Sequence, residues 1–146
     1  MFRLKSPAFD NSQEMDQKYG KMAQNVSPPL EWEGAPDGTR SFALAFVDIH
    51  PIGRDYVHWL VADINPQLSS LPEGAAGSHR SGFSELNAYV GPFPPDGTHD
   101  YKFTLYALRT DRLGIRPRPM LREFSRAAEG HALAAATLIG KFTKIG

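Results

Sequence analysis

Residues 41–48 are apolar on both faces of a strand, and this constrains the fold more than any other stretch of the chain. Alternate residues of an extended strand point to the same face of a sheet. One face carries Phe42, Leu44 and Phe46 and ends at Asp48, while the other carries alanine and valine. A strand that is apolar on both faces has to be covered on both, so the segment predicts a central strand in a layered sheet.

Residues 56–64 show a second alternating pattern, which is also typical of a strand. Strict alternation would place Tyr56 and His58 on one face together with Leu60 and Ala62. The other β segments that we predict are residues 101–108, 2–4 and 89–90, and residues 10–30 are predicted as a loop.

The end of the chain changes character. Residues 120–128 and 130–142 are rich in alanine and leucine, and Pro117 and Pro119 precede the first of them, which predicts two short helices. The 13 glycines and 12 prolines among 146 residues make up about 17% of the chain, against roughly 12% in average proteins, which favours many turns between short strands. We therefore expect a mostly β fold, with helices covering one edge of the sheet, in a single domain over residues 1–146.

The composition argues against several classes of function. The chain has no cysteine, which excludes disulfides, thiolate metal sites and thiol redox catalysis. Sixteen basic residues balance sixteen acidic ones, so no overall field draws the protein to nucleic acid or to an anionic membrane, and any bound anion must be held locally. The N-terminal residues lack a signal peptide pattern and no stretch resembles a membrane span, so we expect a cytoplasmic protein.

Four polar side chains stand at the ends of predicted strands: Asp48, His58, His99 and Tyr101. A rigid scaffold commonly presents ligand-binding residues at such positions. His99 and Tyr101 follow the proline-rich residues 91–97 and share a face with an apolar row of alternate residues. These features predict the wall and mouth of a pocket.

Several motifs occur in the order in which one known family has them. They are Asn25 to Trp32 (Asn-Val-Ser-Pro-Pro-Leu-Glu-Trp), Asp48 to Pro51, His58-Trp59, Tyr89 to Pro95 (Tyr-Val-Gly-Pro-Phe-Pro-Pro), His99 to Tyr101, and Gly130 to Ala134. Together they resemble the phosphatidylethanolamine-binding protein family, and most closely its short bacterial and archaeal members, the branch labelled Raf-kinase-inhibitor-like. The resemblance implies a β-sandwich of largely antiparallel sheets with a small pocket for phosphate, acetate or a phospholipid headgroup.

Family positions map onto this chain residue by residue. The resemblance implies ligand-binding roles for nine residues, namely Asp48, Tyr56, His58, Gly91, Phe93, Pro94, Pro95, His99 and Tyr101. Two departures stand out. Asp48-Ile49-His50-Pro51 replaces the family's Asp-Pro-Asp-Ala-Pro, and Phe93 stands where larger eukaryotic relatives tend to have glycine, which implies a narrower mouth and makes a bulky diacyl lipid a poorer ligand.

The chemistry of these residues favours anion capture. His58, His99, Tyr101 and the amides of Gly91 and Phe93 can donate hydrogen bonds to phosphate, whereas proline has no amide hydrogen. Asp48 would repel an anion, so we expect it to accept a hydrogen bond from His58 or His99 and fix the tautomer. The Gly-Ser-rich residues 74–82, with His79 and Arg80, are expected to lie over the pocket.

Two other functions remain open from the sequence. Two histidines with one carboxylate could hold a metal ion in a hydrolase, although no nucleophile motif or tight ligand spacing accompanies them, so we predict no enzyme, no cofactor and no metal. A regulatory interaction with a protein partner, as in kinase-inhibitor-like relatives, is the other alternative, and a homodimer is also compatible with the sequence.

Overall fold

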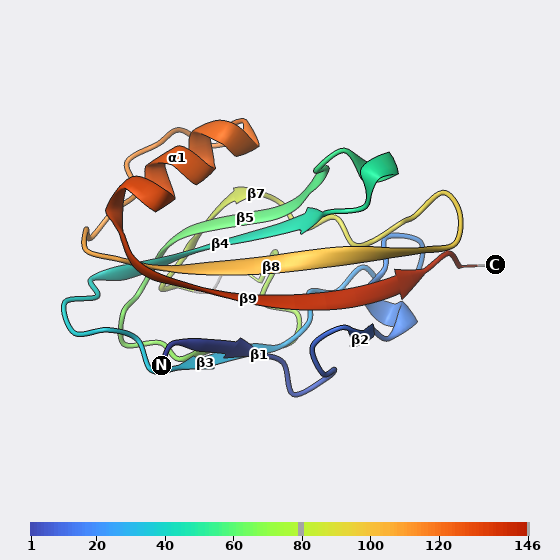
Figure 1. Ribbon diagram of the computed structural model, residues 1–146, viewed down its shortest axis with the longest axis horizontal. Coiled ribbons are helices and arrows are strands. Elements are labelled where there is room, and N and C mark those ends of the chain that lie inside the picture. Colours follow the sequence, from blue (N-terminus) through green and yellow to red (C-terminus); the bar gives the residue numbers. More distant parts are fainter. Residues whose placement is uncertain (79–80, 146) are drawn as a thin grey trace.

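Helix α1 covers one face of a large sheet, and a small sheet lies against the other face (Figure 1). The computed structural model describes residues 1–78 and 81–145. The strand order is β2-β9-β8-β4-β5-β7 in the large sheet and β1-β3-β6 in the small one. The elements are β1 (Arg3–Lys5), β2 (Gln13–Glu14), the 3-10 turn η1 (Gln17–Tyr19), β3 (Leu30–Glu33), β4 (Ser41–Asp48), the 3-10 turn η2 (Pro51–Gly53), β5 (Val57–Ile64), β6 (Ser70–Leu71), β7 (Ser84–Asn87), β8 (Thr98–Leu108), α1 (Leu121–His131) and β9 (Ala132–Thr143).

Strand β4 is central, as its two apolar faces predict. It lies between β5 and β8, pairs antiparallel with both, and is buried along its whole length. On the side of the small sheet, the Phe46 ring stacks on Phe103 with 3.8 Å between ring centroids, and Phe42 packs on Trp32 of β3 at 5.5 Å. On the opposite face its alanines form a second apolar cluster with Phe124 of α1. The mostly β fold with two sheets is therefore confirmed.

The second predicted helix, over residues 130–142, is wrong. Residues 130 and 131 end helix α1, and the rest of the segment forms β9, a 12-residue strand that pairs antiparallel with β8 along nearly its whole length. Intrinsic helix propensity is a weak preference that tertiary pairing overrides, and without β9 the long β8 would expose an unpaired edge. From Ala136 onward alternate residues are buried, and Leu138 and Phe142 enter the core between the sheets. This period of two was already visible in the sequence and is typical of a strand.

Smaller differences concern the loops. The segment predicted as a loop over residues 10–30 contains β2 and η1 and reaches the first residue of β3. No strand forms at residues 89–90, although the Val90 amide donates to the His58 carbonyl at 2.8 Å, and the nearby strand is β7 instead. No helix among residues 1–78 and 81–145 is both long and apolar enough to cross a membrane.

Candidate functional site

A cavity of about 170 Å³ lies where β4 ends and β5 and β8 begin. Six of its lining residues are ones that the sequence predicted for the site: Asp48, Tyr56, His58, Phe93, Pro95 and Tyr101. The other two, Ile52 and Gly53, come from the η2 turn and were missed. Both residues directly follow the segment from Asp48 to Pro51. The wall of the cavity that they form is therefore the one next to the segment that departs from the pattern of the family.

A β-bulge turns His58 toward the cavity. Phe46 pairs with Trp59 and Val47 pairs with Val57, so His58 is the extra residue on β5. His58 and Trp59 consequently both face the core between the sheets, where His58 packs on Tyr101 with 5.1 Å between ring centroids. The predicted alternation, with Leu60 and Ala62 on the same face as His58, is wrong, because both of these residues belong to the cluster under α1.

The Asp48 carboxylate is fixed through both oxygens. Oδ2 accepts a hydrogen bond from His99 Nδ1 at 2.8 Å, and Oδ1 accepts one from the His50 amide, also at 2.8 Å. Of the two histidines considered as partners, His99 is therefore the one that bonds Asp48. His99 is 1% exposed and does not line the cavity. It supports the wall from behind, and a methyl group at Gly53 would overlap the carboxylate from the other side.

His50 holds the η2 turn in place. Its ring stacks on the His99 ring with 3.8 Å between centroids and 4° between planes, and its Nδ1 accepts a hydrogen bond from the Ile52 amide at 3.1 Å. The turn then leaves through Arg54 and Asp55, both in the left-handed region at φ values of 49° and 58°. His50 thus connects the turn to the Asp48–His99 pair.

His58 has one ring nitrogen committed and one free for a ligand. Nδ1 donates to the Val90 carbonyl, because a carbonyl oxygen can only accept. Burial lowers the pKa of His58 below its ordinary value, and the Val90 carbonyl and Asp48 oppose this only partly. At neutral pH the ring is uncharged, so Nε2 carries a lone pair and becomes a donor only when His58 is protonated.

The Tyr101 hydroxyl is a buried donor at the cavity wall. The residue is fully buried, and its hydroxyl makes no hydrogen bond of good geometry among the described residues, although Asp48 and the Phe93 amide are close enough to affect its pKa. Burial, followed by the negative charge of Asp48, raises the pKa of Tyr101 far above its ordinary value, so the hydroxyl keeps its proton. A buried polar group without a partner is uncommon in folded proteins and needs an explanation.

Phe93 narrows the mouth of the cavity. Its ring meets the Tyr56 ring edge-on at 5.5 Å between centroids and the His58 ring at 5.7 Å. The Lys21 ammonium lies 4.6 Å from the centre of the Phe93 ring, within the range of a cation–π contact. Phe93 is 36% exposed, so it stands at the boundary between cavity and solvent.

Besides His99, two other predicted site residues, Gly91 and Pro94, do not line the cavity. The Gly91 amide donates to Asn25 Oδ1 at 2.7 Å, and a methyl group at Gly91 would overlap the Tyr19 carbonyl, so this residue packs the loop. The prediction that the Gly91 amide donates to a ligand is therefore wrong, because this amide already donates to Asn25. Pro94 is buried next to Phe93 and lies outside the cavity lining.

The remaining expectations concern metals and the loop over residues 74–82. Among the described residues no group of three histidine, cysteine, aspartate or glutamate side chains could hold a metal ion, so Asp48, His58 and His99 do not form such a group. Of the 74–82 loop, residues 74–78 and 81–82 do not line the cavity, and His79 and Arg80 lie outside the described residues.

Known proteins match this chain over nearly its whole length. The family model described as phosphatidylethanolamine-binding protein matches residues 5–143. A UPF0098 protein of Methanothermobacter thermautotrophicus is 34% identical over 97% of this chain and 98% of its own length. A protein of Mycobacterium tuberculosis named "Putative lipoprotein LppC" is 35% identical over 95% of this chain and 71% of its own length. Among solved structures, YbcL of E. coli covers 99% of both chains with a TM-score of 0.88 at 23% identity, which shows a common fold.

Proposed function

Because the chain belongs to the phosphatidylethanolamine-binding protein family, we propose that it binds small phosphorylated or carboxylate anions, including a phospholipid headgroup, in the cavity at Tyr101. The observation that carries the proposal is the buried Tyr101 hydroxyl, which lacks a partner among the described residues. A ligand oxygen would satisfy this donor and remove the cost of leaving it unpaired.

His58 would supply the second hydrogen bond. Its free Nε2 belongs to a cavity-lining side chain that contacts Tyr101, so an anion between the two could accept from both. An anion stabilises the protonated ring, so binding would raise the pKa of His58 and take up a proton. The Phe93 amide stays a predicted third donor.

Asp48 would act as a positioning residue. A free carboxylate beside an anion is repulsive, but both oxygens of Asp48 already accept hydrogen bonds, from His99 and from the His50 amide. The carboxylate therefore holds the wall in one geometry. We propose that an anion is held between Tyr101 and His58, whose donors offset the repulsion from the nearby Asp48 carboxylate.

The size of the cavity favours a headgroup over a whole lipid. A volume of about 170 Å³ is below the range of roughly 300 to 1,000 Å³ that is typical of pockets for drug-sized ligands. Phe93 and Tyr56 meet edge-on across its mouth. We propose that a phosphate, a carboxylate or a headgroup enters, and that acyl chains stay outside.

Substitution of Tyr101 tests the proposal directly. We expect Tyr101→Phe to weaken phosphoethanolamine binding by roughly ten- to 100-fold, since a hydrogen bond to a charged group contributes about 1.5 to 3 kcal/mol. Calorimetric titration measures the change. Tyr106→Phe is the matched control, because Tyr106 lies in the cluster under α1 on the other face of the sheet. Equal affinity of Tyr101→Phe and wild type would remove this cavity as the anion site.

The wider setting of this activity is also a proposal. A cytoplasmic location remains our prediction, although the name of one relative describes a lipoprotein, which would be attached to a membrane. A regulatory protein partner, a homodimer and the lack of enzymatic activity likewise stay predictions. They are compatible with anion binding, because a filled or empty cavity could change the surface that a partner meets.

A further inference from the structure

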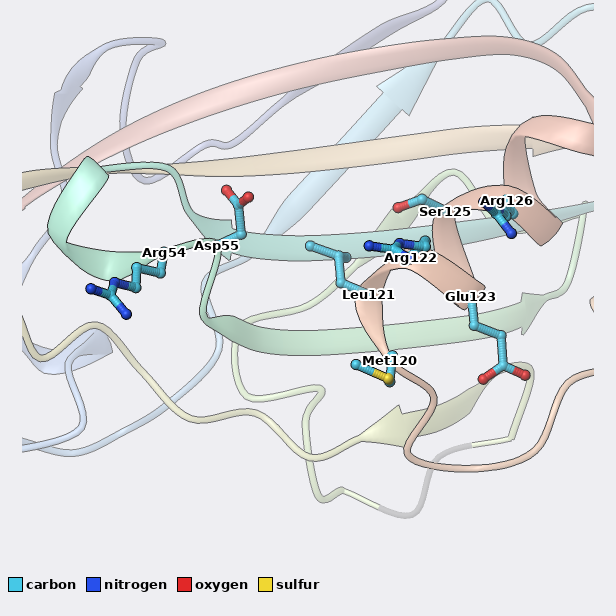
Figure 2. A pocket seen from close by; sticks show the side chains of 8 residues that line it. All are labelled: Arg54, Asp55, Met120, Leu121, Arg122, Glu123, Ser125 and Arg126. Atoms are coloured by element: carbon cyan, nitrogen blue, oxygen red, sulfur yellow. The ribbon is translucent and has the colours of Figure 1, made fainter.

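A second, larger cavity lies on the other side of the connection between β4 and β5. It has a volume of about 730 Å³, and its two walls are the Arg54–Asp55 segment and the first turns of α1 (Figure 2). Ile52 and Tyr56, which flank that segment in the chain, line the smaller cavity. The two cavities are therefore neighbours that share one short connection.

Three arginines line this larger cavity, which we call the groove. Arg122 and Arg126 are four residues apart on α1 and so lie on the same side of the helix, and Arg54 lies on the other wall. None of the three forms an ion pair with a carboxylate in the described part of the chain. The two acids of the groove are Asp55 and Glu123, and Figure 2 shows Glu123 pointing away from Arg126. Three arginines against two acids leave the groove with one excess positive charge, so it is locally basic although the chain has no net charge.

Large apolar side chains surround the same connection. Met120 at the start of α1 is 78% exposed, Ile52 is 65% exposed and Tyr56 is 46% exposed. Together with Phe93 they come from separate elements next to the two cavities. Contiguous exposed apolar side chains with a charged rim commonly mark an interaction surface.

We propose that this surface, made of Ile52, Arg54, Tyr56, Met120, Arg122 and Arg126, docks on a bilayer that contains anionic phospholipids. Basic side chains interact with anionic headgroups, and neighbouring apolar side chains enter the boundary between headgroups and acyl chains. The surface carries both kinds of side chain within one region. Docking of this kind needs no ligand in the smaller cavity, so it does not rest on the function proposed above.

A two-fold symmetric dimer of this protein would fit the surface less well than a bilayer does. In a two-fold interface the same patch meets itself, so the arginines of one copy would face those of the other. An acidic protein would satisfy the arginines but would leave Met120 and Ile52 without an apolar partner. A bilayer accommodates both the charges and the single protruding apolar side chains.

Vesicle co-sedimentation of the whole protein tests the proposal. We expect binding to phosphatidylcholine vesicles that contain phosphatidylglycerol, little binding to pure phosphatidylcholine, and weaker binding at high salt. The double substitution R122Q/R126Q should weaken binding about 25-fold, at roughly fivefold per charge. Met120→Ser should weaken it by at least about tenfold, since an apolar side chain no longer enters the boundary between headgroups and acyl chains.

Matched controls lie on the small sheet. R3Q/K5Q removes two charges from β1, on the face opposite α1, and should bind vesicles like the wild type. R122Q/R126Q should bind phosphoethanolamine like the wild type, because neither arginine lines the small cavity, so failure of the docking surface is distinguishable from failure of that cavity. Equal binding to both vesicle types would overturn the proposal. So would an equal loss in R3Q/K5Q, a dimer in sedimentation analysis that R122Q/R126Q abolishes, or capture of an acidic peptide without vesicle binding.

Discussion

Binding of glycerophosphoethanolamine is expected to tighten up to tenfold for each pH unit as the pH falls from 8 toward the pKa of free His58. This ligand is a phosphodiester, so its charge stays constant over the range and only the protein titrates. Burial lowers the pKa of His58 in the empty protein, and a bound anion raises it again. At a pH between the pKa of His58 in the empty protein and its pKa in the complex, binding takes up one proton. Below the pKa of the empty protein, the affinity stops rising as the pH falls.

His58→Gln should flatten this profile. Glutamine can still donate to the Val90 carbonyl, which Nδ1 of His58 does in the wild type, but it cannot take up a proton. His131→Gln is the matched control, because His131 is exposed at the end of α1 and far along the chain from the site. Calorimetry in buffers with different ionisation enthalpies counts the protons that are taken up. A profile that stays steep in His58→Gln would show that another group titrates.

The lowered pKa of His58 also makes the free energy of unfolding depend on pH. His58 has a folded-state pKa below its unfolded value, so the unfolded chain binds the proton more readily. The contribution of neutral His58 is complete above about pH 6.5 and is lost as the pH falls below it. An anion that binds the protonated ring should therefore protect the protein most strongly in mild acid.

Removal of His99 is expected to produce the largest loss of stability. His99→Leu would leave Oδ2 of Asp48 buried without its hydrogen-bond partner, and a buried acceptor left in this way costs about 1 to 3 kcal/mol of unfolding free energy, and more when the acceptor is charged. His99→Asn should cost much less, because the asparagine amide can donate from nearly the position of Nδ1. Urea unfolding above pH 7 measures both variants.

Comparing the two variants separates hydrogen bonding from packing. His99→Leu fills much of the space of the imidazole, so its loss reports mainly the unpaired carboxylate. Equal destabilisation by leucine and asparagine would mean that the shape of the ring, including its stack on His50, matters more than the hydrogen bond to Asp48.

Much of the site could be predicted because its residues stand at the ends of strong strand patterns. Asp48, His58 and Tyr101 were predicted from alternation and from motifs, and all three line the cavity. The β-bulge at His58 could not be predicted, because one extra residue changes which faces its neighbours occupy without changing the apolar pattern. Ile52 and Gly53 were missed because an irregular turn has no periodicity to read.

The error at the end of the chain has a related cause. Alanine-rich residues 132–143 satisfy the local preference for a helix, yet β8 offers a long strand edge that β9 pairs with. Long-range pairing therefore decided the structure of this segment. The second cavity also escaped prediction, since Arg54 and Arg126 line one cavity only because α1 packs over the sheet.

A comparison of an anionic ligand with a cationic one tests most directly the central claim, that the small cavity binds anions. The cavity contains a carboxylate and aromatic rings, which could also attract an ammonium group. We therefore compare inorganic phosphate with ethanolamine in parallel calorimetric titrations at pH 6. We predict that phosphate binds and that ethanolamine alone does not bind. Binding of ethanolamine without binding of phosphate would contradict the assignment of the cavity as an anion site.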